Sequence, residues 1–281
     1  MLQWISYTIQ GGFVHMENHP LHYDIDAIGQ DIVHFEDFID SSFYLIQGAD
    51  RALLIDTGCG GGNVRRLASA FTDKEIDLAV THAHGDHDAH AGEFDRVYMH
   101  RADIELRRAA QLCAPAEKRL DVDRFLALED GALLDLGGGA VVRTLHIPGH
   151  TPGSVAFVDE AHKAVFTGDA IGSGVGVWMQ LPGCCTVSEY KAALLHFATE
   201  LYPYRDYRFL GGHYRQADPP YSKAHNPVCM QMVEDMIRLC DEMLAGRAQD
   251  AVFAGRAFGD EQPHIASCGT AAMVYLPSRV R

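Results

Sequence analysis

Three histidines and one aspartate lie within six residues of one another in the segment 81–87, whose sequence is THAHGDH. The mostly apolar run 76–80 that precedes them is typical of a buried strand. A strand end that opens into this pattern directs several side chains toward one point, and neutral imidazole is the commonest protein ligand for zinc and related metals. The spacing therefore predicts a metal site. The alternative interpretation is a solvated polar turn.

Four further candidates follow predicted strands in the same manner. Each sits beside glycine after an apolar run, and the four are Asp56 in IDTG, His150 in PGHTPG, Asp169 in TGD and His213 in GGH. Glycine allows the backbone to turn sharply, and loops held by a rigid sheet often carry site residues. We therefore expect these side chains to converge with those of segment 81–87.

The elements that must position these residues alternate between strands and helices. Strands are predicted at 43–46, 52–55, 76–81, 96–99, 131–136, 140–147, 153–158, 163–168, 207–211, 250–257 and 270–276. Helices are predicted at 63–71, 101–112, 116–129, 188–202 and 225–245, and a long loop at 170–187. Sheets covered by helices bury such a pattern best. Because nothing resembles a linker, one domain is predicted over residues 1–281, with an irregular segment at 1–27.

Composition excludes several classes of function. The net charge of −15 argues against nucleic acid and against anionic membrane surfaces, since both need a basic face. No run of eighteen apolar residues is present, so no membrane span is expected, and the amino terminus lacks a secretory pattern. Seven cysteines form an odd count in a large chain, which favours a reducing cytoplasm over a disulfide framework. The adjacent pair Cys184 and Cys185 is interpreted as buried small apolar residues.

Taken in order, the motifs at 81–87, 148–153, 167–169 and 212–213 resemble the metallo-β-lactamase superfamily, in its branch of glyoxalase II-like hydrolases and lactonases. Asp56 matches the Asp-x-Gly strand end of that superfamily. The resemblance extends from about residue 28 to residue 276. It implies an α/β fold, the four-layer αββα sandwich, with a dinuclear metal site at the edges of the sheets.

The resemblance also implies a ligand set. One metal ion would be held by His82, His84 and His150, the second by Asp86, His87 and His213, and the bridging position would be Asp169. Asp86 is in addition the candidate catalytic residue that orients water or accepts its proton, and Asp56 would hold ligands through hydrogen bonds. A nitrogen-rich set of this kind favours two Zn²⁺ ions and is also compatible with iron or manganese.

This ligand set implies a metal-dependent hydrolase in which a hydroxide activated by two metals attacks a small acyl substrate, namely an ester, a lactone or a thioester. Two departures from the family pattern refine the prediction. Ala89 and His90 replace a common Gly-Gly, and the bridge is Asp169 where several β-lactamases have cysteine, so β-lactam cleavage is not expected. Every motif histidine is present, which favours hydrolysis over the redox chemistry of the oxygen-reducing branch.

Candidates for the substrate pocket follow the ligands along the chain. Trp178 and Met179 lie in the glycine-rich loop after Asp169, and Tyr214 and Arg215 follow His213. His90 is a further candidate, with a structural role as the alternative. Core packing is the alternative for the first pair, and a solvated loop for the second. The histidine-rich segment 15–22 would either cap the pocket or form a surface turn.

Other reactions remain open on the same site. Arg215 and Lys223 would suit a phosphoester or sulfate-ester hydrolase, and a metal-dependent ligand sensor is a third hypothesis. The expected partner in every case is a small molecule. The sequence leaves the oligomeric state, the metal and the substrate undetermined.

Overall fold

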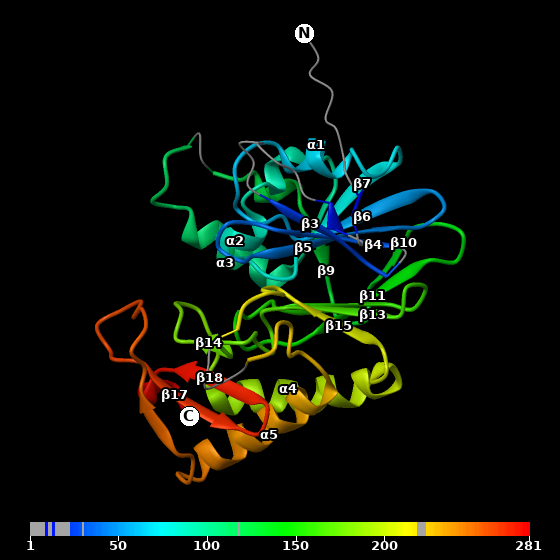
Figure 1. The fold of residues 1–281 in the computed structure, drawn as a ribbon. Helices are drawn as coiled ribbons and strands as arrows, with labels where there is room; N and C mark the ends of the chain where they lie inside the picture. Colours follow the sequence, from blue (N-terminus) through cyan, green and yellow to red (C-terminus); the bar gives the residue numbers. More distant parts are fainter. Residues whose placement is uncertain (1–8, 11–12, 15–22, 30, 117–118, 218–222) are drawn as a thin grey trace.

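Two β-sheets face each other in the middle of the molecule, and helices cover their outer sides (Figure 1). The computed structural model describes residues 9–10, 13–14, 23–29, 31–116, 119–217 and 223–281. The order of layers is helices, sheet, sheet, helices, which confirms the predicted four-layer αββα sandwich. The histidine-rich segment 15–22 lies outside the described residues.

The first sheet has nine strands that follow one another in chain order. They are β1 (Ile9–Gln10), β2 (Phe13–Val14), β3 (Asp24–Ile28), β4 (Ile32–Glu36), β5 (Ser42–Gln47), β6 (Arg51–Ile55), β7 (Glu75–Ala79), β8 (Val97–His100) and β9 (Leu126–Leu128). Neighbours from β1 to β6 are antiparallel, whereas β6 to β9 run parallel. The helical segments that accompany this sheet are α1 (Val64–Ala68), α2 (Gly85–Asp88), α3 (Arg101–Ala110) and the short 3₁₀ turns Ala91–Glu93 and Val122–Arg124.

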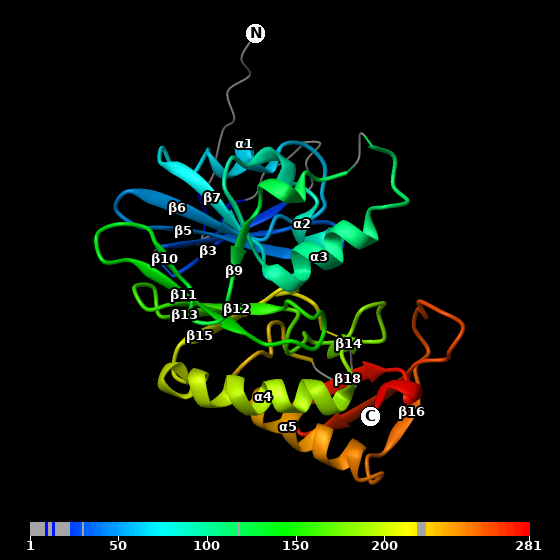
Figure 2. The same cartoon turned by 180° about the vertical axis from the view of Figure 1, so that it is seen from behind.

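The second sheet has five strands in the order β10-β11-β12-β13-β15. Their bounds are β10 (Leu133–Asp135), β11 (Val141–His146), β12 (Val155–Asp159), β13 (Ala164–Gly168) and β15 (Arg208–Gly211). Two long helices, α4 (Val187–Leu201) and α5 (Met230–Leu244), lie side by side beneath this sheet in both views (Figures 1 and 2). A 3₁₀ turn, Tyr202–Tyr204, follows α4.

A third, smaller sheet packs against α5 and has the order β14-β18-β17-β16. Its strands are β14 (Val177–Met179), β16 (Asp250–Val252), β17 (His264–Cys268) and β18 (Ala271–Tyr275), followed by the 3₁₀ turn Pro277–Arg279. The edge strand β14 pairs in parallel with β18, so a segment just after β13 is joined to the end of the chain. In Figure 1 this sheet lies at one end of the sandwich.

Because side chains alternate along a strand, one strand contributes to two hydrophobic cores. On β6, Ala52 and Leu54 face the layer of α1–α3, whereas Leu53 and Ile55 face the second sheet. Successive strand residues point to opposite faces, so a run that is apolar throughout indicates a sheet covered on both sides. Across the interface, Phe157 of β12 is fully buried. Burial of one such side chain contributes about 1.5–3 kcal/mol.

The ends of the parallel strands meet at one edge. The backbone N–H of Val155 donates to the carbonyl of Thr81 at 2.9 Å, and the N–H of Ser42 donates to the carbonyl of Gly212 at 2.7 Å. These bonds join the two sheets where β7 and β15 end. Ligands in open α/β sheets bind beyond the carboxyl ends of the strands. The candidate residues come directly after strands that end at this edge.

Three local predictions are corrected by the structure. The described residues 119–129 do not form the predicted helix, because Leu126–Leu128 is the edge strand β9, paired in parallel with β8. The predicted loop 170–187 contains β14, and β17 was not predicted. The segment 1–27, expected to be irregular, contributes β1, β2 and most of β3. In each case the hydrogen bonds of a partner strand override the local pattern. That a single domain spans the chain stays a prediction.

Two further observations concern the whole described chain. No described helix is both long and apolar enough to cross a bilayer. All seven cysteines lie in the described part and are unpaired. Of the adjacent pair predicted to be buried, Cys184 is buried and Cys185 is only half-buried. The Cys184 thiol donates to the carbonyl of His150 at 3.0 Å.

Candidate metal centre and adjoining cavity

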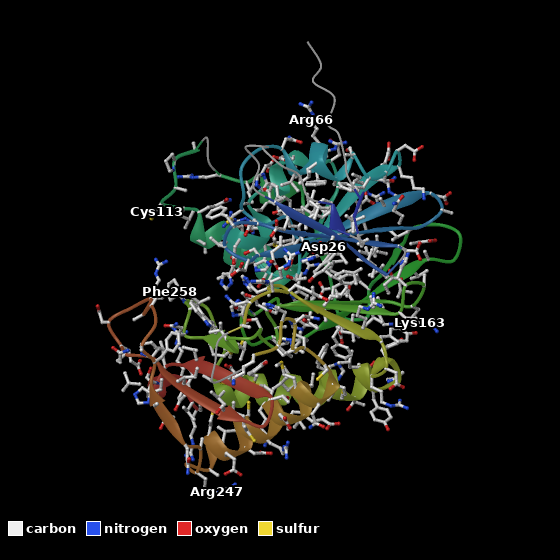
Figure 3. The ribbon with its side chains drawn as sticks, in the orientation of Figure 1. Asp26, Arg66, Cys113, Lys163, Arg247 and Phe258 are labelled. Carbon is white, nitrogen blue, oxygen red and sulfur yellow. The ribbon has the colours of Figure 1, made fainter. Side chains whose placement is uncertain are left out.

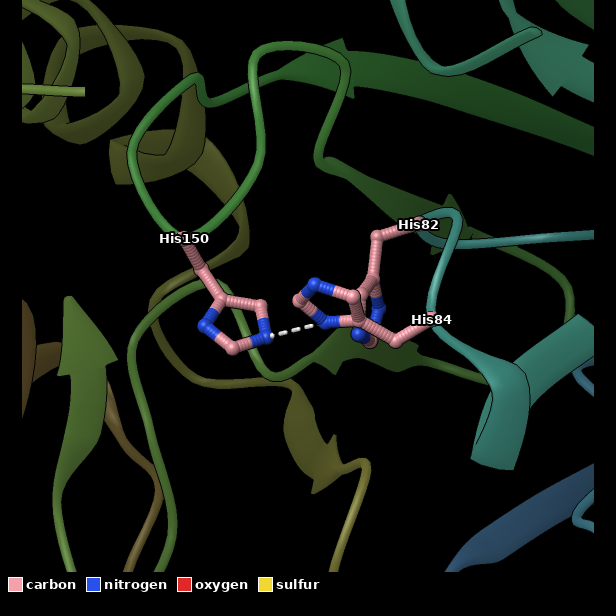
Figure 4. Close-up of side chains that lie close together, drawn as sticks. All are labelled: His82, His84 and His150. Carbon is pink, nitrogen blue, oxygen red and sulfur yellow. Dashed lines mark hydrogen bonds between the residues drawn. The ribbon is translucent and has the colours of Figure 1, made fainter. Parts of the chain in front are cut away.

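Seven predicted ligands come together at the edge where the two sheets meet. Three groups have donor atoms within 4.8 Å of one another, namely His82 with His84 and His150, His82 with His87 and Asp169, and Asp86 with His87 and His213. Figure 4 shows the first group, in which His84 Nδ1 and His150 Nε2 lie 2.9 Å apart. The first and third groups have the same members as the two ligand sets that the resemblance implies, and the second joins one histidine from each set to Asp169.

Asp169 lies between the three-histidine group and the group of Asp86, His87 and His213. Its Oδ1 is 3.6 Å from His87 Nε2, and its Oδ2 is 3.7 Å from His150 Nε2 and 3.2 Å from His213 Nε2. One carboxylate therefore reaches imidazoles of both groups. This is the arrangement that a bridging ligand requires.

The pKa shifts of the three-histidine group, His82, His84 and His150, differ from those of the group that contains carboxylates. Burial, reinforced by the neighbouring imidazoles, lowers the pKa of His82 well below its usual value and that of His84 to about 3. Burial also lowers the pKa of His150. Neutral imidazoles keep the lone pairs that a cation needs.

Carboxylates dominate the other group. Although burial opposes it, Asp86 and Asp169 raise the pKa of His87 well above its ordinary value. Burial likewise raises the pKa of Asp169, but the charges of His213 and His87 outweigh it and hold that pKa well below the usual range. Carboxylates that stay ionised here add negative charge where a second cation would bind.

Unpartnered buried atoms provide a test of whether this donor set fits a metal. Among the described residues, His82 Nε2, His87 Nε2 and Asp169 Oδ1 are buried without a hydrogen-bond partner. A buried polar atom left unpaired costs about 1–3 kcal/mol. These three are among ten buried side-chain atoms without a partner in the described residues, and they are the ones that lie in the convergent set. Nitrogen and oxygen donors suit Zn²⁺ and its neighbours. The residues present therefore fit a metal centre.

In four of the five histidines, His82, His87, His150 and His213, Nδ1 is held by a neighbour outside the ligand set. His150 Nδ1 donates to the carbonyl of Trp178 at 2.7 Å, and His213 Nδ1 donates to the carbonyl of Asp40 at 2.9 Å. Such bonds fix the ring orientation and leave Nε2 directed into the site.

Asp56 orients one imidazole from each group. Its Oδ2 accepts from His87 Nδ1 at 3.0 Å and from the Thr81 hydroxyl at 2.7 Å, and that hydroxyl lies 3.0 Å from His82 Nδ1. Oδ1 accepts from the Thr81 backbone N–H at 2.7 Å. Asp56 adopts a φ of 63°, a left-handed conformation that aspartate tolerates better than most residues. The role predicted for Asp56 agrees with these contacts.

Two glycines make the close approach of the strand ends feasible. A Cβ at Gly168, whose φ is 48°, would overlap the side chain of Thr81. A Cβ at Gly212 would overlap the carboxylate of Asp169 and contact the ring of His87. Glycine at these positions lets β13 and β15 deliver Asp169 and His213 next to the 81–87 segment.

Asp103, at the start of α3, is a site residue that sequence reasoning missed. Its fully buried carboxylate accepts from the backbone N–H of Ala83, the hydroxyl of Thr151 and the backbone N–H of Gly153, each at 2.7 Å. It thereby ties the loop of His82 and His84 to the loop of His150. Burial raises the pKa of Asp103, although these three hydrogen bonds oppose the shift. No motif surrounds this residue, so the sequence carried no signal for it.

The substitution Asp103→Asn is expected to weaken metal binding at the three-histidine group by about tenfold, as loss of an indirect ligand contact typically does. The asparagine side chain has one oxygen that accepts hydrogen bonds, whereas both carboxylate oxygens of Asp103 accept. At least one of the backbone N–H groups of Ala83 and Gly153 therefore loses its acceptor. Metal titration followed by isothermal calorimetry would measure the change. Glu105→Gln, on the exposed side of the same helix, is the matched control and should bind metal as the unchanged protein does. Equal affinity in both variants would contradict the role of Asp103.

A cavity of about 390 Å³ opens directly onto the convergent residues. Its floor includes His84, Asp86, His150, Asp169 and His213, and its walls are formed by Ile39, Gly85, Gly172, Ser173, Gly176, Trp178, Leu181, Gln216 and Phe258. Trp178 thus lies where it was predicted. The Ser41 hydroxyl donates to Asp86 Oδ2 at 3.2 Å and steadies that partly exposed carboxylate.

The other four predicted pocket residues do not line this cavity. Met179 is buried in the core around α4 and α5. Tyr214 packs on the ring of His34, and Arg215 pairs with Asp24, Asp26 and Glu36 on the first sheet.

His90 is held by Glu93 at 3.0 Å and by the carbonyl of Gly60 at 2.9 Å, so its role is structural. For these four residues, partners on neighbouring segments decide the direction of the side chain. Phe258 and Ile39 line the cavity and were not predicted, and Leu181 of the predicted loop 170–187 lines it as well.

Fold and site together define a metallo-β-lactamase-type sandwich with a histidine- and aspartate-rich centre at its edge. The model of the metallo-beta-lactamase superfamily matches residues 37–226, more than half of the chain. The chain belongs to this superfamily, as its motifs indicated.

Individual relatives are similar over most or half of the chain. The chain is 29% identical over 208 residues to a hydroxyacylglutathione hydrolase of Pseudomonas putida, spanning 72% of this chain and 74% of that protein. It is 28% identical over 171 residues to the acyl-coenzyme A thioesterase MBLAC2 of Homo sapiens, spanning 48% of this chain and 59% of that protein. The solved structure of the DIM-1 metallo-beta-lactamase has a TM-score of 0.56 at 14% identity, covering 79% of this chain and 99% of that one, which shows the shared fold.

Proposed function

We propose that this protein is a metal-dependent hydrolase of small acyl compounds, with a dinuclear centre held by His82, His84, Asp86, His87, His150, Asp169 and His213. The observation that carries the proposal is the convergence of these donors, three of them with buried unpartnered atoms, at the floor of a cavity. The names of the two relatives, a hydroxyacylglutathione hydrolase and an acyl-coenzyme A thioesterase, describe hydrolysis of acyl compounds and support thioesters within this class.

When bound, divalent ions would supply an acidified water and would polarise the acyl oxygen. The chain's own groups do the rest. Asp56, Trp178 and Asp40 orient the imidazoles of His87, His150 and His213, and such preorganised groups lower the cost of rearrangement during a reaction. Asp86, which lines the cavity and is partly exposed, is the carboxylate placed to orient the attacking water or take up its proton.

The contacts of Arg215 weaken the phosphoester and sulfate-ester alternative. Its guanidinium is engaged by three carboxylates, and no lysine or arginine is among the described residues that line the cavity. Lys223, the other cation that suggested this alternative, is therefore also absent from the lining. An anionic phosphate or sulfate ester would therefore meet no lysine or arginine among the described residues that line the cavity.

Metal analysis together with a substrate panel tests the proposal. Purified protein is expected to contain about two metal ions per chain and to lose activity on chelation. The panel should include S-acyl-N-acetylcysteamine thioesters, p-nitrophenyl esters, lactones, bis-p-nitrophenyl phosphate and p-nitrophenyl sulfate. We expect acyl compounds, thioesters first, to be cleaved.

The outcomes separate the hypotheses. Cleavage of only the phosphate or sulfate probe would replace the acyl assignment with the alternative. Saturable binding of an acyl compound without turnover would favour the sensor. A metal-loaded enzyme that leaves every acyl compound intact would overturn the proposal.

A further inference from the structure

The walls of the cavity are apolar above a polar floor. Trp178, Leu181 and Phe258 line one part of it, and Ile39 comes from the turn between β4 and β5 on the first sheet. Ile39 is 42% exposed, and Trp178, Leu181 and Phe258 are half-buried. An apolar wall beside a few convergent polar groups is typical of a ligand-binding cavity.

Trp178 connects the wall to the candidate metal centre. Its backbone carbonyl accepts from His150 Nδ1, while its indole lines the cavity and makes edge contacts with Phe253 and Phe258. The ring centroids are 6.1 Å and 5.7 Å apart, within the range of favourable aromatic pairs. One residue, Trp178, therefore contacts both the candidate ligand His150 and the aromatic side chains of the wall.

Phe258 belongs to the loop between β16 and β17, which Figure 3 shows at the end of the sandwich. Gln180 Nε2 donates to the carbonyl of Arg256 at 3.0 Å, and Gln262 Nε2 donates to the carbonyl of Phe253 at 3.0 Å. The Arg256 guanidinium stacks on the Phe258 ring at 4.6 Å. These contacts hold the aromatic ring over the cavity.

The loop lies beyond residues 37–226, the part matched by the superfamily model. One wall of the cavity is thus built by a segment outside that matched range.

The polar groups of the walls are few and neutral. Ser173 Oγ donates to Gln216 Oε1 at 2.5 Å, so these two side chains already satisfy one another in part. No cationic side chain is among the described wall residues. A charged or strongly polar substituent buried here would lose its hydration without a partner. An apolar group would gain by burial.

We propose that this cavity binds the acyl group of the substrate and selects apolar acyl groups, either aliphatic chains of medium length or groups with a single aromatic ring. The cavity of about 390 Å³ is near the lower end of known ligand pockets, which span about 300–1,000 Å³. Long lipid chains therefore extend beyond it. The inference rests on the proposed function and specifies its substrate class.

A series of S-acyl-N-acetylcysteamine thioesters with a constant leaving group tests the selection. From acetyl to hexanoyl, kcat/KM is expected to rise about threefold per methylene group. The phenylacetyl compound should match the hexanoyl one, and the succinyl compound should be poor. If no member is cleaved, the proposed function itself fails. If all members, succinyl included, are cleaved with equal kcat/KM, the function stands and this inference is overturned.

Variants of the wall test which residues select. Trp178→Ala should lower kcat/KM for the hexanoyl thioester by about 30-fold, mainly through KM, and for the acetyl thioester by less than about threefold. Phe258→Ala should lower the hexanoyl value by about tenfold, and Phe258→Leu should restore most of it. Tyr202→Ala removes an exposed aromatic ring, 57% accessible, on the 3₁₀ turn after α4 and is the matched control. Equal losses for acetyl and hexanoyl substrates would overturn the assignment.

A binding measurement avoids dependence on turnover. The chain has two tryptophans, so Trp4→Phe leaves Trp178 as the sole indole. Hexanoate and phenylacetate, the product acids, should change its fluorescence in a saturable manner, and succinate should not. A response to succinate equal to that of hexanoate would contradict an apolar acyl site.

Discussion

Replacing His84 with alanine is expected to lower kcat/KM by about 10³-fold or more and to remove one metal equivalent. His84 lines the cavity and belongs to the group with His82 and His150, in which its Nδ1 lies 2.9 Å from His150 Nε2. A catalytic metal ion supplies several kcal/mol of transition-state stabilisation, and each 1.36 kcal/mol is a factor of about ten in rate. The side chain is partly exposed, so the fold should survive its truncation.

His90→Ala is the matched control for this experiment. His90 lies six residues further along, is also partly exposed, and contacts Glu93 and Gly60 away from the cavity. Metal content by mass spectrometry and the metal-induced rise in melting temperature should be preserved in this variant and reduced in His84→Ala. Full metal content and full activity in His84→Ala would remove the basis of the proposed centre.

The substitution Asp56→Ala is expected to reduce both stability and metal affinity. It leaves the backbone N–H and the hydroxyl of Thr81 and the Nδ1 of His87 without their acceptor in a fully packed region. Unpaired buried donors cost about 1–3 kcal/mol each, with partial relief by rearrangement, so a loss of about 2–4 kcal/mol in the free energy of unfolding is expected. Metal affinity should fall by about 10–100-fold, because His82 and His87 both lose their orientation.

Urea unfolding of the metal-free protein measures the first effect, and metal titration measures the second. Asp56→Asn keeps the size and tolerates the left-handed φ, so it should lie between the alanine variant and the unchanged protein. If Asp56→Ala unfolds at the same urea concentration and binds metal equally well, Asp56 has no positioning role.

Much of the candidate centre was visible in the sequence because the ligands belong to short local patterns. His82, His84, Asp86 and His87 lie in one segment, and Asp169 and His213 follow glycines at strand ends. A strand that ends in glycine and then a ligand must place that ligand at the edge of a sheet. The structure brings the donor atoms of all seven close together.

Elements whose partners lie far away in the chain were predicted poorly. β9 was predicted as part of the helix 116–129, yet its hydrogen bonds to β8 decide its conformation. β14 was predicted as part of the glycine-rich loop 170–187, whereas three of its residues pair with β18 near the end of the chain. Local propensity cannot include hydrogen bonds that form only when distant strands meet.

The sequence by itself determined the types of donor atoms and the strand ends that carry them, since both are properties of neighbouring residues. Only the tertiary structure decided what surrounds the donors. Asp103 joins two ligand loops, and Phe258 reaches the cavity from a separate sheet. Arg215 turns away toward carboxylates of the first sheet. The direction of a side chain depends on the packing of segments remote in sequence, and no periodicity in a single chain records that packing.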